Sequence, residues 1–172
     1  VSAYNNAGYD IIGPDNLVPY SGSVTLNLVT MTLIVVGGLG FAVLYDIAVK
    51  KQFRKFTMHS KIVLCMTAVL IVSGAVLLKV IEHGRWMDMF FQSVTARTAG
   101  FKTIEIGQMT SGGILVLIVL MFIGASPGST GGGIKTTTFF PMLITAFSLA
   151  RGKKLSAFQR KIPTDSVIKA FT

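Results

Sequence analysis

The feature that most constrains the fold is a pair of long stretches with almost no charge. Residues 24–45 contain no charged side chain, and residues 62–81 contain one, Lys79. As helices of about 22 and about 20 residues, both are long enough to cross a hydrocarbon core of about 30 Å. The whole chain is 51% hydrophobic and 13% charged, which is too apolar for an ordinary soluble domain. These patterns predict an all-α membrane protein.

The charges that remain are mostly cations, and they gather at the ends of the apolar runs. One basic group lies in residues 46–61 and another in residues 151–161, and the formal net charge is +9. Cytoplasmic loops of membrane proteins are enriched in Lys and Arg, so both segments are expected on the cytoplasmic side of a multi-pass protein of the cell (plasma) membrane. The cations are not interleaved with exposed aromatic residues on a polar face, so no nucleic-acid partner is expected.

Two segments interrupt the helical pattern. Residues 86–97 form a stretch of about 12, which is too short to span and is typical of a re-entrant or interfacial helix. Residues 112–149 would form a helix of about 57 Å, too long for one crossing. The break in it, residues 124–138, contains Pro127, five glycines and Lys135. Non-helical backbone and a cation at membrane depth are tolerated against protein or a water-filled cavity, so the break is expected to face a lumen.

A pattern of polar residue, alanine, glycine and aromatic residue occurs twice, at residues 6–9 and 92 positions later at residues 98–101. Each copy precedes a turn-rich loop, a Ser-Gly pair and an apolar run. Internal repeats of this kind are typical of transport proteins. A glycine frees the backbone so that carbonyl oxygens can face a lumen and replace the water around a cation, and the C-terminal end of a short helix adds partial negative charge. The repeat therefore predicts a selectivity filter for an alkali cation.

Three motifs read S-A-Y-N-N-A-G-Y-D at residues 2–10, F-F-Q-S-V-T-A-R-T-A-G-F at residues 90–101 and M-F-I-G-A-S-P-G-S-T-G-G-G-I-K-T-T-T-F at residues 121–139. They resemble the Ktr/Trk potassium-uptake family and, within it, the KtrB-type membrane subunits. The resemblance implies a K⁺-channel-like fold of four helix, pore-helix, helix repeats around a central pore. It divides the chain into the end of a second repeat (1–61), a third repeat (62–152) and a cytoplasmic linker to a fourth repeat (153–172).

The resemblance also assigns roles to individual residues. K⁺, with Na⁺ as a second candidate ion, would be bound by backbone carbonyls of two filter segments: Asn6, Ala7, Gly8, Tyr9, Thr98, Ala99, Gly100 and Phe101. A gate beneath the filter would comprise Gly128, Ser129, Thr130, Gly131, Gly132, Gly133 and Lys135. Arg97 would support the filter, by binding carbonyls at the helix end and bracing the turn. The partners implied are the lipid membrane, a second copy in a homodimer and a cytosolic nucleotide-binding ring of the RCK type, with no organic cofactor on this chain.

Two features depart from the family pattern. Lys102 follows the second filter segment, where a small polar residue is usual in the third repeat. A cation at this position would repel incoming K⁺ unless it pairs with Glu105 or Asp10. The chain also contains two of the four filter segments that such a pore needs, so it is expected to be part of a longer chain.

Two other function classes compete with this interpretation. A secondary transporter with broken helices, coupled to Na⁺ or H⁺, would explain the break in residues 124–138 but not the two matched glycine turns. Gly128 and Gly133 have the glycine spacing of a phosphate-binding loop, but Ile134 separates Gly133 from Lys135, and an apolar run stands where a strand is required. The sequence offers no Ser/His/Asp or Cys/His set, so it does not predict an enzyme.

Overall fold

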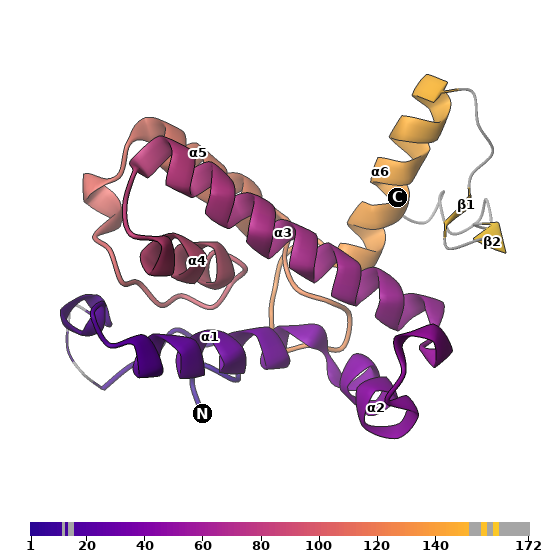
Figure 1. Ribbon diagram of the computed structural model, residues 1–172, viewed down its shortest axis with the longest axis horizontal. Coiled ribbons are helices and arrows are strands. Elements are labelled where there is room, and N and C mark those ends of the chain that lie inside the picture. The colour runs from indigo at the N-terminus through magenta and orange to yellow at the C-terminus, as the bar shows by residue number, and fades with distance from the viewer. Residues whose placement is uncertain (12, 14–15, 152–155, 158–159, 162–172) are drawn as a thin grey trace.

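The computed structural model describes residues 1–11, 13, 16–151, 156–157 and 160–161. This part of the chain is helical, apart from two short paired strands (Figure 1), which confirms the predicted all-α class. The linker predicted at residues 153–172 lies almost wholly outside the described residues. The elements are η1 (Val18–Tyr20), α1 (Val24–Leu39), α2 (Phe41–Lys50), η2 (Phe53–Lys55), α3 (Met58–Glu82), α4 (Trp86–Thr95), η3 (Ile106–Gln108), α5 (Ser111–Phe122), α6 (Thr136–Arg151), β1 (Ser156–Ala157) and β2 (Arg160–Lys161).

The longest helix, α3, is the one against which the others pack. Its 25 residues cover the span predicted at residues 62–81. Among the described helices, α3 alone is long and apolar enough to cross a membrane, and α1 and α2 would add a second crossing if they are counted as one broken span. The helix α5 is apolar but has only 12 residues. At 1.5 Å per residue it covers about 18 Å, less than the hydrocarbon core.

The first predicted span is not a straight helix. Residues 24–45 were expected to continue without a break, but α1 and α2 meet at an angle of 99°. The bend lies at Gly40, whose φ of 82° belongs to a conformation that other residues rarely adopt. Beyond it, the Phe41 N–H donates to the Gly128 carbonyl at 3.2 Å, so the segment between α5 and α6 takes part in the bend.

The short helix predicted at residues 86–97 is α4, and it lies between α1 and α3 (Figure 1). Most of its side chains are buried: Asp88, Met89, Phe91, Gln92, Ser93, Val94 and Thr95. Met89 faces the apolar cluster shared with α3 and α5, and Phe91 faces the cluster shared with α1. Full burial of side chains of this size stabilises the fold by about 1.5–3 kcal/mol each. The Ser93 hydroxyl donates to the Ile71 carbonyl of α3 at 2.8 Å, which fixes the depth of α4.

Two helices begin with the same carboxylate arrangement. Thr57 and Thr110 are the N-cap residues of α3 and α5. The Thr57 N–H and hydroxyl donate to Asp46 Oδ2 at 3.0 and 2.7 Å, and those of Thr110 donate to Glu82 Oε1 at 2.9 and 2.6 Å. Each carboxylate comes from the preceding long helix, Asp46 from α2 and Glu82 from the end of α3, and lies near the positive end of the helix dipole, which is a favourable position for an anion. The turns between the long helices are therefore fixed by side chains as well as by apolar packing.

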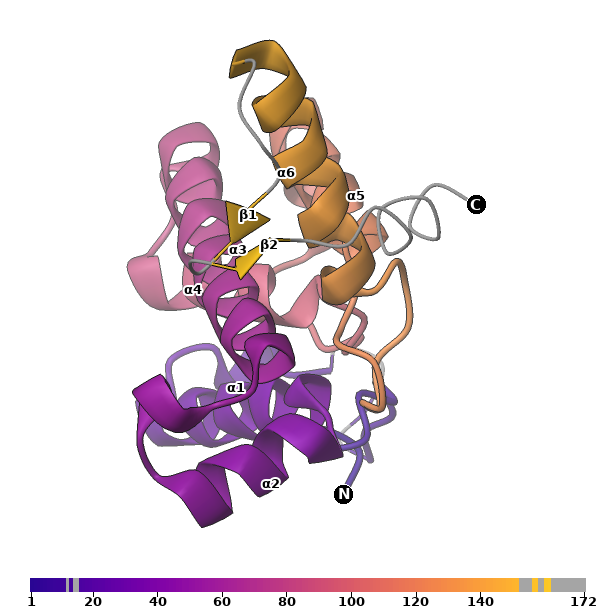
Figure 2. The same cartoon turned by 90° about the vertical axis from the view of Figure 1, so that its right-hand side faces the viewer.

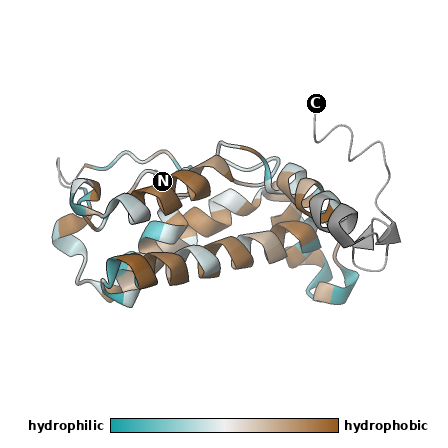
Figure 3. Cartoon of the chain, turned by 90° about the horizontal axis from the view of Figure 1, so that it is seen from above, coloured by the Kyte–Doolittle hydropathy of each residue, from teal (hydrophilic) through white to brown (hydrophobic). Residues whose placement is uncertain are grey.

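The helices α3 and α5 consist mainly of apolar residues (Figure 3). Exposed apolar side chains on α3 and α5 away from the cavity described below include Val69, Val72, Val76, Leu77, Val80, Leu115, Ile118, Val119 and Phe122. An exposed apolar surface of this extent suits contact with lipid or with further protein.

Candidate ion filter and the loop beside it

The two glycine turns predicted from the repeat lie in direct contact. Gly8 and Gly100 both have left-handed backbones, with φ of 69° and 83°. A Cβ placed on Gly8 would lie 3.0 Å from the Ala99 carbonyl oxygen and 3.1 Å from the Gly100 Cα. Glycine is therefore required at both positions for two reasons, the left-handed backbone conformation and the lack of room for a side chain.

The sequence repeat is also a repeat of backbone conformation. Asn6 and Thr98, which are 92 positions apart, both have positive φ, at 50° and 70°. The alanine between each of them and the following glycine has no positive φ. Positive φ is uncommon in residues other than glycine, so its occurrence at two equivalent positions reflects a shared local structure.

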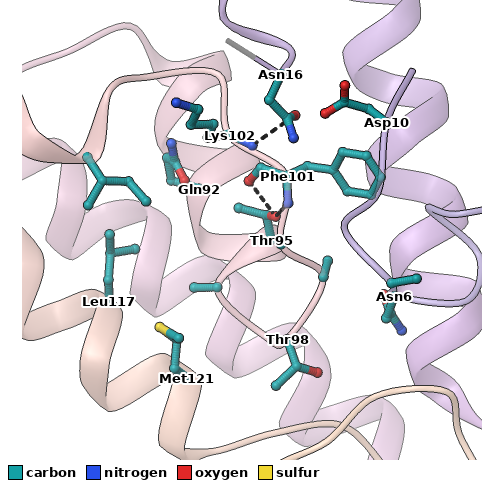
Figure 4. Close-up of a pocket in the computed structure, with 15 residues that line it drawn as sticks. Asn6, Asp10, Asn16, Gln92, Thr95, Thr98, Phe101, Lys102, Leu117 and Met121 are labelled. Carbon is teal, nitrogen blue, oxygen red and sulfur yellow. Dashed lines mark hydrogen bonds between the residues drawn. The ribbon is translucent and has the colours of Figure 1, made fainter. Parts of the chain in front are cut away.

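The second turn is attached to the end of α4. The Ala99 N–H donates to the Thr95 carbonyl at 3.0 Å. The Thr95 hydroxyl accepts from the Phe101 N–H at 2.9 Å and donates to the Phe101 carbonyl at 2.7 Å (Figure 4). The two copies differ in their aromatic residue, because Phe101 is 7% exposed whereas Tyr9 is 80% exposed. The second copy is therefore held by the protein interior at both ends.

A cavity of about 450 Å³ lies beside the turns and is shared by both (Figure 4). Its lining combines residues of both turns, residues next to them, and residues of α4 and α5: Asn6, Ala7, Asp10, Gln92, Thr95, Thr98, Ala99, Gly100, Phe101, Lys102, Leu117 and Met121. In the described residues, no group of three or more His, Cys, Asp or Glu side chains could hold a metal ion. Residues 6–9 and 98–101 include no carboxylate, so a cation bound by the turns would meet neutral oxygen atoms, among them backbone carbonyls of the kind used in K⁺-selective filters.

The predicted break between α5 and α6 is a loop closed at its neck. Gly124 N–H donates to the Ile134 carbonyl at 3.0 Å, and Ala125 N–H donates to the Gly132 carbonyl at 3.1 Å. These bonds satisfy backbone groups that a broken helix leaves unpaired. Helix α6 begins at Thr136, so the break is shorter than the predicted segment of residues 124–138. We refer to residues 123–135 as the α5–α6 loop.

The tip of the α5–α6 loop reaches the polar residue of each glycine turn. The Asn6 amide donates to Thr130 Oγ1 at 2.9 Å, and the Gly132 N–H donates to Thr98 Oγ1 at 3.0 Å. Gly131 lies between these contacts, and a Cβ there would approach Thr98 Oγ1 to 2.9 Å. The loop therefore contacts both turns at equivalent positions of the repeat, with a glycine where the approach is closest.

The same loop covers the end of α1, as its descent toward the α1–α2 junction in Figure 2 illustrates. The Thr130 N–H donates to the Gly37 carbonyl at 3.3 Å, and the Ser126 N–H donates to the Gly38 carbonyl at 3.2 Å. The Ser126 hydroxyl donates to the Leu39 carbonyl. These are the last carbonyls of α1, which the bend deprives of helical partners. Gly37 and Gly40 leave room for the loop, because a Cβ would lie 3.1 Å from Thr130 Oγ1 at Gly37 and 2.8 Å from the Pro127 carbonyl oxygen at Gly40.

The three cations singled out from the sequence have different roles. Arg97 is 7% exposed, and its Nη2 reaches Thr67 Oγ1 at 3.4 Å and the Gly124 carbonyl at 3.5 Å. The carbonyl that it reaches lies at the base of the α5–α6 loop, just past the end of α5, and the role of Arg97 in supporting the filter stays a prediction. Lys102 pairs with Glu105 at 3.0 Å, one of its two predicted partners. Lys135 donates to the Gly131 carbonyl at 2.8 Å, within the loop.

Two residues of this site were not singled out from the sequence. Thr95 ties the second turn to α4, and Ser126 ties the loop to α1. A buried hydroxyl in the last turn of a short apolar helix, just before a glycine turn, was the available signal for Thr95. Ser126 had no comparable signal, because its partner is 87 positions away in the sequence.

The chain is similar to known cation transport proteins. Residues 60–171 match the family described as TrkH, cation transport protein. The chain is 39% identical over 184 residues to Ktr system potassium uptake protein B of Bacillus subtilis, a match covering 99% of this chain and 41% of the relative. It is also 39% identical to potassium/sodium uptake protein NtpJ of Enterococcus hirae, over 100% of this chain and 41% of the relative.

A solved structure shows the same fold. The crystal structure of the potassium transporter TrkH from Vibrio parahaemolyticus superposes with a TM-score of 0.76 at 20% sequence identity, covering 98% of this chain and 39% of that one. The chain thus spans about two fifths of the length of these relatives. The relatives are cation transporters and not enzymes, which agrees with the absence of a catalytic set in the sequence. Their class also supports a membrane location for this chain. The family match over residues 60–171 shows that this chain belongs to the TrkH/Ktr family of cation transport proteins.

Proposed function

We propose that this chain forms part of the K⁺-translocating subunit of a membrane K⁺ uptake system, and that its two glycine turns are two walls of the selectivity filter. The observation that carries the proposal is the contact between Gly8 and Gly100, two equivalent positions of the repeat with matching backbone conformations. The names of the relatives, which are potassium uptake proteins, support K⁺ as the transported ion. Na⁺ is the second candidate ion.

In this proposal, selection depends on backbone carbonyls of residues 6–9 and 98–101. Carbonyl dipoles replace the hydration shell of the ion, and their number and spacing decide how well K⁺ is favoured over Na⁺. The shared cavity beside the turns supports this assignment, because one space is lined by both copies. The remaining walls would come from other repeats of the protein.

We further propose that the α5–α6 loop is the gate. Its support is the position of Gly131, between the Asn6 and Thr98 contacts, against the polar residue of each turn. A loop in this position would obstruct ions that leave the filter, and its movement would require these hydrogen bonds to break. Lys135 would act within the gate by holding the Gly131 carbonyl.

The assembly and topology of the whole protein are part of the same proposal. Residues 1–61 and 62–152 would be the end of one repeat and the whole of the next, with the basic segments 46–61 and 151–161 in the cytoplasm. A homodimer controlled by a cytosolic nucleotide-binding ring of the RCK type is the expected assembly. The ring would contact exposed cations of residues 46–61, namely Lys51, Arg54 and Lys55.

Replacement of Gly100 by serine tests the filter. Because Gly100 has a φ of 83° and a Cβ would lie 3.0 Å from the Gly8 Cα, Gly100→Ser must displace the lining carbonyls. The protein at its natural length should then lose preference for K⁺ over Na⁺ in competitive uptake. Gly107→Ser is the matched control, since nothing lies within 4 Å of a Cβ at Gly107. Unchanged competition between the two ions in Gly100→Ser would rule out the filter role.

A further inference from the structure

The side chain of Thr95 makes an unusual pair of contacts. Thr95 is the last residue of α4 and is 6% exposed. Its hydroxyl accepts a hydrogen bond from the Phe101 N–H at 2.9 Å and donates one to the Phe101 carbonyl at 2.7 Å (Figure 4). The Thr95 hydroxyl thus donates to and accepts from the same residue, Phe101, which follows the glycine of the turn. These two hydrogen bonds close the turn at its C-terminal end.

These contacts determine the direction of the carbonyls in the turn. The Phe101 N–H and the Gly100 carbonyl belong to one planar trans peptide, so they point in opposite directions. Because the N–H points at Thr95, the Gly100 carbonyl points away from α4. The Ala99 N–H donates to the Thr95 carbonyl at 3.0 Å, so the Thr98 carbonyl also points away from α4 by the same geometry. Thr95 therefore orients two alternate peptides of the turn.

The Phe101 carbonyl has the opposite orientation. It accepts from the Thr95 hydroxyl at 2.7 Å, so it is directed toward α4 and not with the Thr98 and Gly100 carbonyls. Arg97, the side chain expected to support the filter, cannot replace this contact, because its guanidinium reaches Thr67 and Gly124. The first copy has Ala3 at the equivalent position, 92 residues before Thr95, and alanine has no hydroxyl.

We propose that Thr95 is a positioning residue for ion selectivity: its hydroxyl turns the Gly100 carbonyl toward the ions and holds the Phe101 carbonyl back, so that the ion-facing carbonyls of this segment end at Gly100. The inference rests on the proposed filter function and narrows the filter residues assigned from the resemblance. It also makes the two copies unequal, because the first copy lacks the hydroxyl.

The test compares Thr95→Val, which keeps the shape and removes the hydroxyl, with Thr95→Ser, which keeps the hydroxyl. Initial rates of Rb⁺ or K⁺ uptake are measured in the protein at its natural length against increasing Na⁺. Loss of two buried hydrogen bonds to one peptide segment should reduce the preference for K⁺ over Na⁺ by about five- to tenfold in Thr95→Val, while Thr95→Ser should stay within about twofold of the unmodified protein. Thr32→Val is the matched control, because the Thr32 hydroxyl donates to the Leu28 carbonyl on the exposed side of α1.

Two outcomes overturn the inference. One is an unchanged ion preference in Thr95→Val. The other is a loss of preference in Thr95→Ser as large as that in Thr95→Val, which would show that side-chain shape and not the hydroxyl matters. If Thr95→Val does not fold, Thr95→Cys replaces it in the test. Because a thiol forms weaker hydrogen bonds than a hydroxyl, Thr95→Cys should also reduce the preference for K⁺ over Na⁺, by less than the about five- to tenfold expected for Thr95→Val. A second measurement is the unfolding temperature of the purified protein in K⁺ compared with that in Na⁺. If Gly100→Ser changes ion preference and Thr95→Val does not, this inference fails alone, whereas unchanged preference in Gly100→Ser removes the proposed filter itself.

Discussion

The hydroxyl of Thr130 offers the sharpest test of the gate. It accepts from the Asn6 amide at 2.9 Å and donates to the Tyr4 carbonyl at 3.0 Å, so it ties the α5–α6 loop to the first glycine turn through two hydrogen bonds. Thr130→Val removes both bonds and keeps the shape of the side chain. In a displaced loop, water can satisfy the same groups, so the change weakens the closed position relative to the open one.

The size of the effect follows from the two bonds. A neutral hydrogen bond contributes about 1 kcal/mol, so their loss should shift the closed-to-open equilibrium by about 2 kcal/mol, or roughly 30-fold. A protein whose gate is open about 1% of the time would then be open about a fifth of the time. K⁺ flux without a regulatory partner should rise by roughly 20-fold.

The assay is K⁺ flux into liposomes that contain the purified protein at its natural length, normalised to the amount of protein inserted. Thr145→Val is the control, since the Thr145 hydroxyl donates to the Pro141 carbonyl within α6, away from the turns. A rise in flux for Thr130→Val with no change for Thr145→Val is the expected result. Flux that stays at the parental level, or falls, would refute the assignment of this loop as the gate.

Two further predictions concern other contacts of the site. Ser126→Ala removes the donor to the buried Leu39 carbonyl at the α1–α2 bend and should cost about 1–3 kcal/mol, seen as a fall of several degrees in the unfolding temperature; an unchanged temperature would argue that the loop does not hold the bend. Lys102→Gln should change K⁺ uptake by less than about twofold, because Lys102 already pairs with Glu105 in a partly exposed ion pair of small energy; a large rise at low salt that shrinks at high salt would show that Lys102 repels incoming K⁺.

The sequence predicted those parts of the fold that depend on local patterns. The helices α3 and α4 follow from the length of their apolar runs, and the pair of glycine turns follows from a repeated motif. The repeat also predicted that both turns belong to one filter, because equivalent segments of a repeat tend to share one axis. These features need little knowledge of distant residues.

The rest depends on contacts between distant segments. An apolar run with glycines looks the same whether it is straight or bent, and the bend at Gly40 involves backbone groups of Ser126 and Gly128, more than 80 positions later. The partner of Arg97 could not be predicted for the same reason, since the Gly124 carbonyl lies close only after α5 has packed on α3. Neither arrangement leaves a periodic signal in the sequence.

The most direct test of the central claim is to locate the ion. Crystals of the protein at its natural length, grown with Rb⁺ in place of K⁺, would reveal the bound ion by its anomalous scattering. The account predicts a Rb⁺ site coordinated by backbone carbonyls of both glycine turns, including that of Gly100 but not that of Phe101. A site formed by side chains away from residues 6–9 and 98–101, or turns with no ion beside them, would contradict it.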